Sequence, residues 1–275
     1  MIIRNEICDK LENIVKNLKY VKHCIGCEGL DLNIKDPKHH PSVELTQKCN
    51  LNCFFCYSKL KKVKRGIYGN LEEAKALTIS QYGEPLFDIE GVKRAILLGK
   101  KYNLRVDLQT NGVFLNEEIL EEFKELGLDI VMISLSCFSK ESYRKITGKD
   151  YFDKVKENIK IASKYFHTII RSIYLPNFNE KELIEMAKYF DGIVDEIMIH
   201  HPIAYNNNLP KEYKIKDLLM LVDKIHLEVK KTNVSIKGCL LSQLKEMDGF
   251  ILANINYNAI SEVPEIKREY HPLPW

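Results

Sequence analysis

The sequence lacks a hydrophobic run long enough to cross a membrane. No apolar stretch approaches the ~20 residues that a transmembrane helix requires. The opening segment, MIIRNEICDKLENIV, is charged every few positions, unlike the uninterrupted apolar region of a signal peptide. We therefore predict a soluble, cytoplasmic protein with no membrane partner.

The sequence also lacks a marked excess of charge of one sign. Its 41 basic and 38 acidic residues are interspersed, and the net charge of +3 is too small to indicate a nucleic-acid-binding protein. The usual signatures of nucleic-acid-binding modules are absent, so nucleic acid is only a minor expectation as a partner. One tryptophan and abundant Lys, Ile and Glu are typical of an archaeal, thermophile-like composition.

The eight cysteines do not form the dense framework of a small secreted protein, and we expect no disulfide bonds. Three of them, Cys49, Cys53 and Cys56, form a CxxxCxxC motif in KCNLNCFFCYS. Four thiolates complete the coordination of an iron–sulfur cluster or a structural zinc ion, whereas three leave one metal position open to a ligand that is not protein. The alternatives are a zinc site completed by His39 or His40, and buried thiols without a metal.

Short apolar segments alternate with amphipathic helical patterns along the chain, which predicts parallel strands joined by right-handed crossovers. With 275 residues, 45% of them hydrophobic, the chain can bury one large core. We predict an α/β fold, a full or partial barrel of the TIM type with its functional groups at the C-terminal ends of the strands.

The predicted strands cover residues 42–46, 76–80, 105–109, 130–134, 168–174 and 196–200. The predicted helices cover residues 89–102, 116–126, 153–165, 180–190 and 216–231. The predicted domains are an N-terminal helical extension (1–40), the barrel (41–232) and an irregular C-terminal tail (233–275).

From about residue 41 to about residue 202 the sequence resembles the radical S-adenosylmethionine (SAM) superfamily. In that family a CxxxCxxC motif follows the first barrel strand, its thiolates hold a [4Fe-4S] cluster, and the open iron takes the amino and carboxylate groups of SAM. Here the cysteine motif follows the predicted strand SVELT, and Phe55 takes the aromatic position before the last cysteine. The resemblance implies a partial (β/α)6 barrel that binds both cofactors.

A second motif, SQYGEPLF, resembles the Gly-Gly-Glu-Pro sequence with which the family binds the amino group of SAM. Gly83, Glu84 and Pro85 carry the match, while Tyr82 replaces the first glycine and reduces the backbone freedom there. A glutamate at the end of a barrel strand can accept a charge-assisted hydrogen bond from an ammonium group, which is the role that the resemblance implies for Glu84. Three environments suit the Tyr82 side chain: it is a ring in the core, a residue of a surface turn or a group that faces the cluster.

Polar residues in the next strands match positions where relatives contact SAM. Ser134 and Ser136, in VMISLS, share one face of a strand by its period of two, in the region that often contacts the SAM ribose. Arg171 interrupts the apolar run TIIRSIYLP, where relatives often place a basic residue toward the SAM carboxylate. An internal salt bridge with a barrel carboxylate is the alternative for Arg171. LQTNG, at the end of the third predicted strand, is interpreted mainly as a structural turn.

Further histidines and cysteines have several possible roles. His200 and His201 end the sixth predicted strand, and at most one of them faces the barrel interior because adjacent strand residues point oppositely. Proton transfer, substrate binding and a structural role all fit such a histidine. Cys24 and Cys27, in HCIGCEG, could belong to an auxiliary iron–sulfur cluster, a zinc site or a redox dithiol, or be structural thiols. The remaining cysteines are Cys8, Cys137 and Cys239.

The segment SKLKKVKRG, directly after the cysteine motif, is basic. Its charged residues are Lys59, Lys61, Lys62, Lys64 and Arg65. Such a run is typical of a solvated loop, but beside a cluster it could attract an acidic electron donor of the flavodoxin or ferredoxin type, or an anionic substrate. That attraction would weaken as salt is added.

These observations predict an enzyme in which a reduced [4Fe-4S] cluster donates an electron to SAM. The products would be methionine and a 5′-deoxyadenosyl radical that abstracts hydrogen from a substrate. A peptide or protein, a cofactor precursor and RNA are the substrate classes considered, and the C-terminal tail lacks the seven-cysteine extension of peptide-modifying relatives. The alternative is a non-catalytic iron–sulfur electron-transfer protein or a zinc-stabilised binding protein.

Overall fold

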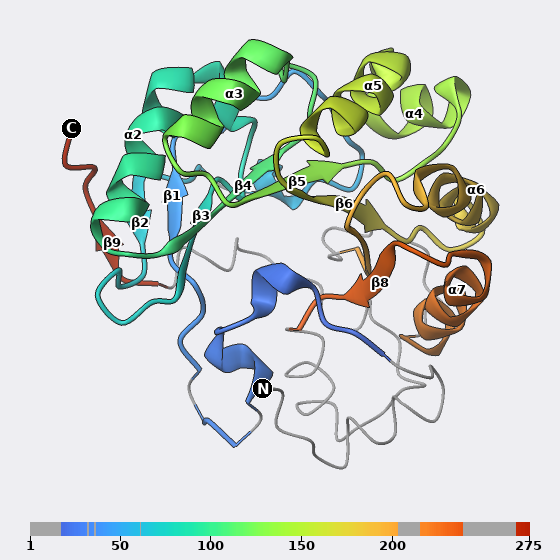
Figure 1. The fold of residues 1–275 in the computed structure, drawn as a ribbon, viewed down its shortest axis with the longest axis horizontal. Coiled ribbons are helices and arrows are strands. Elements are labelled where there is room, and N and C mark those ends of the chain that lie inside the picture. Colours follow the sequence, from blue (N-terminus) through green and yellow to red (C-terminus); the bar gives the residue numbers. More distant parts are fainter. Residues whose placement is uncertain (1–17, 32, 36, 61, 203–214, 239–267) are drawn as a thin grey trace.

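The computed structural model describes residues 18–31, 33–35, 37–60, 62–202, 215–238 and 268–275. Within these residues a curved sheet has the strand order β8-β7-β6-β5-β4-β3-β1-β2-β9, and α-helices cover its convex face (Figure 1). The strands are β1 (Ser42–Glu44), β2 (Gly66–Tyr68), β3 (Ala76–Ile79), β4 (Arg105–Thr110), β5 (Ile130–Ser134), β6 (His167–Ile173), β7 (Glu196–His200), β8 (Asn233–Ile236) and β9 (Tyr270–His271). The α-helices are α2 (Ile89–Lys101), α3 (Glu117–Glu125), α4 (Lys140–Thr147), α5 (Phe152–Ala162), α6 (Glu180–Phe190) and α7 (Ile215–Glu228).

The pairing from β1 through β3 to β8 is parallel throughout, whereas β1–β2 and β2–β9 are antiparallel. All parallel strands therefore end at the same edge of the sheet. The six predicted strands correspond to β1 and β3 to β7, and the five predicted helices to α2, α3 and α5 to α7. Strands β2, β8 and β9 and helix α4 were not predicted from the sequence, and β8 and β9 lie beyond residue 232, in the predicted tail.

Helix α6 illustrates how the sequence builds the outer layer. Its buried residues, Leu183, Met186, Ala187 and Phe190, recur at intervals of three and four, which puts them on one face of the helix. The neighbouring strand β7 is buried along its whole length, as expected for a parallel strand covered on both faces. Full burial of a side chain of this size contributes about 1.5–3 kcal/mol, so this apolar stripe fixes the helix on the sheet.

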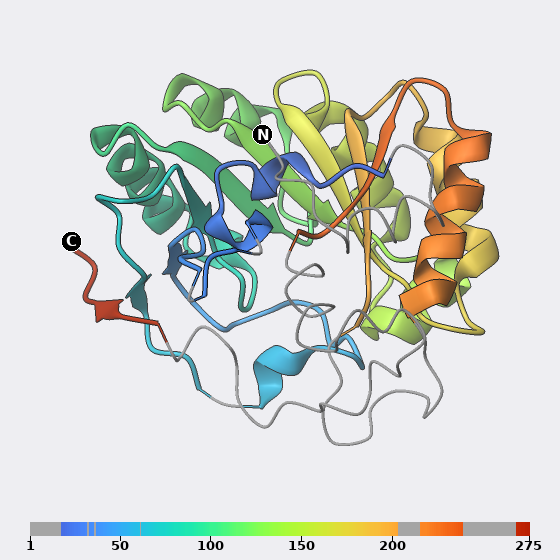
Figure 2. The ribbon, with the colours of Figure 1, turned by 90° about the horizontal axis from the view of Figure 1, so that it is seen from below.

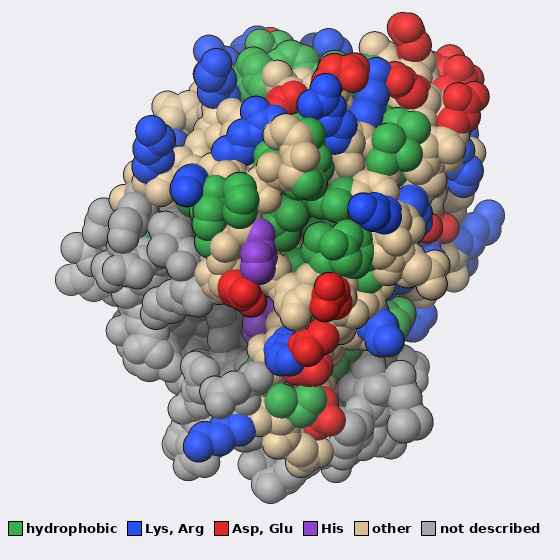
Figure 3. All heavy atoms as spheres, turned by 90° about the vertical axis from the view of Figure 1, so that its left-hand side faces the viewer, with side chains coloured by type: hydrophobic (Ala, Val, Ile, Leu, Met, Phe, Trp, Pro, Cys, Tyr) green, Lys and Arg blue, Asp and Glu red, His purple; other side chains and the backbone are tan. Residues whose placement is uncertain are grey.

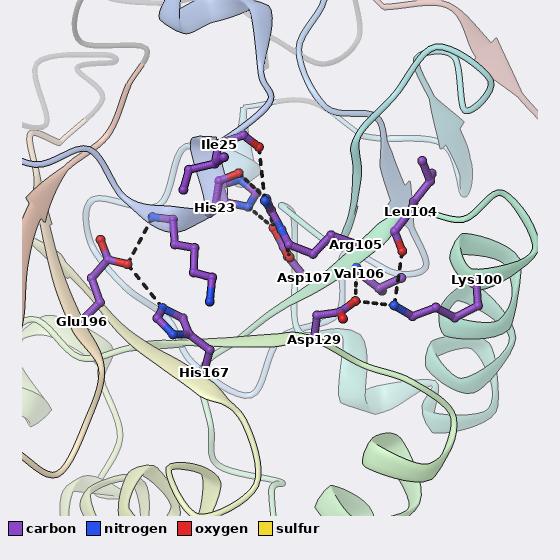
Figure 4. A network of polar contacts seen from close by, with 11 residues as sticks. His23, Ile25, Lys100, Leu104, Arg105, Val106, Asp107, Asp129, His167 and Glu196 are labelled. Carbon is purple, nitrogen blue, oxygen red and sulfur yellow. Dashed lines mark hydrogen bonds and ion pairs between the residues drawn. The ribbon is translucent and has the colours of Figure 1, made fainter. Parts of the chain in front are cut away.

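The N-terminal part of the described chain lies on the concave side of the sheet. Figures 1 and 2 show it crossing from β8 toward β1, opposite the layer of α-helices. It begins beside β8, where Tyr20 forms a parallel bridge with Ile236, and it continues through short 3-10 helices at Lys22–Cys24 and Glu28–Leu30. This segment, which precedes the first strand, thus contacts the residues with which β4 and β7 begin (Figure 4).

The molecular surface mixes both signs of charge. Figure 3 shows acidic and basic side chains interspersed with hydrophobic ones on the face that carries β9 and the C-terminal residues. Among the described residues, every helix is too short or too polar to cross a lipid bilayer.

Candidate functional site

A cavity of about 310 Å³ opens where the C-terminal ends of the parallel strands meet. Its lining comes from the segments that end or follow β1 and β3 to β7. It includes most of the residues predicted from sequence, namely Cys49, Cys53, Phe55, Cys56, Gly83, Ser134, Ser136, Arg171 and His200. Residues that are about 150 positions apart in the sequence therefore share one site, at the edge of the sheet where the barrel prediction put it.

The three cysteines lie on an irregular loop that is fastened to the end of α4. The backbone N–H of Asn52 donates to Thr147 O at 2.8 Å, and that of Phe54 donates to Ile146 O at 3.2 Å. Burial, and then the neighbouring Cys56 and Cys49, raise the pKa of the Cys53 thiol to about 12. Three thiolates can share this site only if a strong positive charge compensates them, as a metal cluster does.

The donor set fits an iron–sulfur cluster better than a single zinc ion. Within the described residues, no three His, Cys, Asp or Glu side chains converge closely enough to hold one metal ion. A [4Fe-4S] cluster instead offers a separate iron to each thiolate, so its ligands line a cavity without meeting at one point. His39 and His40, considered as a fourth zinc ligand, line a different cavity from these cysteines.

Gly83 allows the second motif to touch the cysteine loop. Its backbone has a φ of +73°, and a Cβ there would lie 2.3 Å from the carbonyl oxygen of Thr46. The next residue, Glu84, donates its backbone N–H to Lys48 O at 2.8 Å. The position therefore requires glycine both for its torsion angle and for the close approach of two loops.

The Glu84 side chain points into the protein rather than into the cavity. It is fully buried, and its carboxyl group accepts hydrogen bonds from Thr110 Oγ1 at 2.7 Å, Asn111 N at 2.7 Å and Leu86 N at 3.2 Å. Burial raises its pKa to about 7, although these hydrogen bonds oppose the rise. The sequence predicts that this carboxylate binds the SAM ammonium group; in the structure it holds the end of β4 and is not among the residues that line the cavity.

Asn111 is a site residue that sequence analysis missed. The TNG segment does form a turn, with Gly112 at a φ of +78°, as predicted. Asn111 also lines the cavity, and its Nδ2 donates to Asn50 Oδ1 at 2.7 Å and lies 3.8 Å from Cys49 Sγ. A chain of contacts thus runs from buried Glu84 through Asn111 to the first cysteine. The signal available in the sequence was the position of this asparagine at the end of a strand next to β3.

Arg171 brings a positive charge to the cavity. It pairs in register with Ser134 of β5, and its Nη1 donates to Gln109 Oε1 at 3.0 Å. Among the described residues it forms no ion pair, and none of the lining residues is acidic. The internal salt bridge considered from sequence is therefore absent from the described part of the chain, and the guanidinium group faces a cavity that suits an anionic group.

His200 lines the cavity, whereas His201 does not. His200 is in register with Ile173, another lining residue, so both side chains lie on the inner face. Its Nε2 atom is buried and has no hydrogen-bond partner among the residues that the structure describes. Burial, and then the charge of Arg171, hold the pKa of His200 well below its ordinary value, which keeps the imidazole neutral. Tyr82 is fully buried, does not line the cavity and packs edge-on against Tyr57, which makes it a core ring.

Of the other cysteines that the structure describes, Cys24, Cys27 and Cys137 do not line this cavity. Cys27 Sγ is 3.4 Å from His39 Nδ1, and Cys24 Sγ accepts a hydrogen bond from Gly238 N at 3.3 Å. Cys137 is buried in the core. Cys8 and Cys239 lie outside the described residues.

The basic segment lies next to the cysteine loop. Lys59 Nζ donates to Asn52 Oδ1 at 2.6 Å and to Cys53 O at 3.1 Å, so this lysine supports the loop itself. Arg65 forms an ion pair with Asp88 at 2.9 Å. Lys62 and Lys64 are exposed, and Lys61 lies outside the described residues.

Residues 43–190 match the family model of the Radical SAM superfamily. That match covers more than half of the chain, and the chain belongs to this superfamily. It is an enzyme of the radical SAM class, a family that implies a [4Fe-4S] cluster, SAM and a reductant. The non-catalytic alternatives considered from sequence do not agree with this class.

Two curated proteins and one solved structure illustrate the similarity. An uncharacterized protein of Methanocaldococcus jannaschii is 64% identical over 285 residues, covering 100% of both chains. A probable GTP 3′,8-cyclase of Pyrococcus abyssi is 29% identical over 212 residues, which are 71% of this chain and 66% of the cyclase. The chain thus spans slightly less than two thirds of that cyclase. The structure of Streptococcus suis SuiB bound to S-adenosylmethionine matches with a TM-score of 0.60 and 15% identity, over 82% of this chain and 53% of SuiB. This likeness confirms the predicted α/β fold and its radical SAM type of barrel.

Proposed function

We propose that Cys49, Cys53 and Cys56 hold a [4Fe-4S] cluster and that SAM occupies the cavity beside them. When bound and reduced, the cluster supplies the electron that cleaves SAM to methionine and a 5′-deoxyadenosyl radical, which abstracts hydrogen from a substrate. The observation that carries the proposal is the gathering of all three thiols, Arg171 and several hydroxyl groups around one cavity, whose described lining residues include no Asp or Glu.

Each SAM-binding residue has a role that follows from its place. Arg171 binds the SAM carboxylate, because it is the guanidinium group that lines the cavity and its described contacts include no carboxylate. Ser134 offers a hydroxyl group to the ribose, and Phe55 offers an apolar wall beside the cysteines. Gly83 provides backbone contacts to the amino group, since it lines the cavity while the Glu84 side chain does not.

Glu84 acts as a positioning residue. Its carboxyl group fixes Thr110 and the backbone of Asn111, whose side chain reaches Asn50 and Cys49. The buried network therefore sets the orientation of one cluster ligand without touching either cofactor.

His200 faces the substrate side of the cavity. It comes from β7, and the strands β6, β5, β4 and β3 separate β7 from β1, the strand that precedes the cysteine loop. A neutral imidazole can donate or accept one hydrogen bond there, so it suits a polar group near the hydrogen that is removed. GTP is the first substrate to test, because a probable GTP 3′,8-cyclase is 29% identical over 71% of the chain. A peptide and RNA follow it.

An acidic one-electron carrier of the flavodoxin or ferredoxin type is the proposed reductant. From Leu45 to Leu71 the chain contains six basic residues and no acidic one, and this stretch includes all three cysteines. An acidic protein would be steered to the side of the molecule from which electrons must enter, and steering of this kind weakens with salt.

Anaerobic reconstitution with iron and sulfide tests the proposal. The wild-type protein should bind about four irons per chain, as a [4Fe-4S] cluster requires, and form 5′-deoxyadenosine when dithionite and SAM are added. Cys53→Ala should lose both properties. Cys137→Ala is the matched control, because this cysteine is buried outside the cavity, and it should keep both. Iron binding without any reductive cleavage of SAM would refute the proposed function.

A further inference from the structure

The hydroxyl group of Ser58 lies next to the sulfur of the third cysteine of the motif. Ser58 Oγ is 2.9 Å from Cys56 Sγ. We propose that Ser58 donates a hydrogen bond to this sulfur when Cys56 holds the cluster, and that this bond makes the cluster easier to reduce. The inference rests on the proposed function, because it requires the [4Fe-4S] cluster, but it concerns a residue outside the cysteine motif.

The direction of this hydrogen bond follows from the chemistry of the ligand. While Cys56 carries its proton, either the thiol or the hydroxyl group can be the donor. A cysteine that binds a metal is a thiolate and has no proton to donate. Only the Ser58 hydroxyl group can then donate, and the negative charge on the sulfur strengthens the bond.

The backbone of Ser58 is held in place without help from its hydroxyl group. Ser58 is the middle residue of a short 3-10 helix, Tyr57–Lys59. Its carbonyl oxygen accepts from Gln47 Nε2 at 3.0 Å, and Gln47 Oε1 accepts from Val63 N at 2.7 Å. One glutamine side chain therefore joins both ends of the segment that follows the cysteines. Removing the hydroxyl group should leave this segment where it is.

The first cysteine of the motif has weaker polar contacts. Cys49 Sγ accepts from the backbone N–H of Leu51 at 3.4 Å and lies 3.8 Å from Asn111 Nδ2. Asn111 also donates to Asn50 and belongs to the network of Glu84, so its replacement would change several contacts at once. Of these three contacts to sulfur, that of Ser58 is the shortest, and it can be removed by itself.

A hydrogen bond to a ligand sulfur affects the two oxidation states of a cluster unequally. Reduction adds one electron, which the proposed carrier supplies, so the reduced cluster is more negative and gains more from a donor beside its sulfur. Hydrogen bonds to the sulfurs are among the factors that set the potential of iron–sulfur clusters. Ser58 lines the cavity and is partly buried, so water screens this bond incompletely. We expect a variant without the hydroxyl group to be reduced only at a more negative potential.

A potentiometric titration followed by electron paramagnetic resonance tests the proposal. The reconstituted wild type, Ser58→Ala and Ser58→Thr are titrated without SAM, so that only the cluster and its protein ligands contribute. A hydrogen bond to a charged group corresponds to roughly tenfold or more in an equilibrium constant, but here it is present in both oxidation states. At a fixed applied potential, the ratio of reduced to oxidised cluster should therefore fall about three- to tenfold in Ser58→Ala. Ser58→Thr keeps a hydroxyl group and should stay close to the wild type.

Ser163→Ala is the matched control. Ser163 is also partly buried, but its Oγ donates to Lys160 O at 2.9 Å, within α5 and outside the cavity. Its potential should equal that of the wild type. Iron content, and the affinity for SAM in equilibrium dialysis, should be unchanged in all three variants.

Electron–nuclear double resonance of the reduced protein gives a readout that does not depend on the potential. Compared with the wild type, Ser58→Ala should lack one proton that is coupled to the cluster and exchanges in D₂O, whereas Ser58→Thr should keep it. Equal potentials and equal proton signals in wild type and Ser58→Ala would overturn the proposal. So would loss of iron from Ser58→Ala, which indicates a structural role, or weaker SAM binding at an unchanged potential, which assigns the hydroxyl group to SAM. A wild type that binds no iron would refute the proposed function as well, whereas the other three outcomes refute this inference alone.

Discussion

Glu84→Gln is expected to destabilise the protein, because a buried amide accepts fewer hydrogen bonds than the carboxyl group. Glu84 Oε1 accepts from Thr110 Oγ1 and Leu86 N, and Oε2 accepts from Asn111 N. Both oxygens keep acceptor capacity even when one carries a proton, whereas glutamine has a single accepting oxygen. The glutamine amide can be placed in two orientations, with its NH₂ group at the position of Oε1 or of Oε2. In the first the NH₂ group faces the backbone N–H of Leu86, and in the second that of Asn111, so two donors meet in either case. An unsatisfied buried donor costs about 1–3 kcal/mol, so we expect the free energy of unfolding to fall by about 2 kcal/mol at pH 5.

The same substitution should remove a pH dependence. Burial raises the pKa of Glu84 to about 7, compared with an ordinary value of 4.5. The folded protein therefore binds this proton more tightly than the unfolded chain. The contribution of this protonation to the free energy of unfolding is complete below pH 4.5 and is lost as the pH rises through 7. At about 1.4 kcal/mol per pKa unit, Glu84 accounts for a decline of about 3 kcal/mol.

Urea unfolding, followed by circular dichroism at pH 5 and pH 8, measures both effects. The free energy of unfolding of the wild type should fall from pH 5 to pH 8, and that of Glu84→Gln should fall less. The wild type and the variant should therefore differ most in stability at pH 5. Glu118→Gln is the control, because Glu118 is exposed on α3 and should leave stability unchanged. Equal stability and equal pH dependence in wild type and Glu84→Gln would refute this reasoning.

Three further predictions concern the cavity and its surroundings. Arg171→Gln should weaken SAM binding about tenfold or more in equilibrium dialysis, since a charge-assisted bond contributes about 1.5–3 kcal/mol, and unchanged affinity would contradict its role. The His200 ring should remain neutral at pH 6 in carbon NMR spectra of histidine-labelled protein, assigned with His200→Asn; a titration at its ordinary pKa of 6.5 would contradict the burial argument. Lys62→Glu should slow reduction by an acidic flavodoxin and flatten its salt dependence, while dithionite reduction is unaffected. Lys164→Glu, at an exposed site outside the basic segment, should match the wild type in both assays, and the same loss there would argue against local steering.

The central strands could be predicted because each carries its own signal. Strands β5 and β7 begin and end at the predicted residues, and each contains a run of consecutive apolar residues, Ile130–Ile133 and Ile197–Ile199, that ends at a polar residue. Strands β2 and β9 have three and two residues, too few for a periodic pattern to develop. Their pairing depends on Tyr68 and Tyr270 meeting across more than 200 positions of sequence, which no local pattern reveals.

The site was predictable where a residue's type alone indicates its chemistry. Three spaced thiols and one arginine in an apolar strand are informative without a structure. The direction of the Glu84 side chain was not predictable, because its partners, Thr110 and Asn111, come from the end of a neighbouring strand. The contact of Asn111 with the cysteine loop depends in the same way on β4 lying beside β3.

The most direct test of a SAM site next to the three cysteines is the electron paramagnetic resonance spectrum of the reduced, reconstituted protein with and without SAM. A cluster whose open iron takes SAM as a ligand must change its spectrum when SAM is added, and Arg171→Gln should need a higher SAM concentration for the same change. A reduced [4Fe-4S] signal that saturating SAM leaves unaltered would contradict the account.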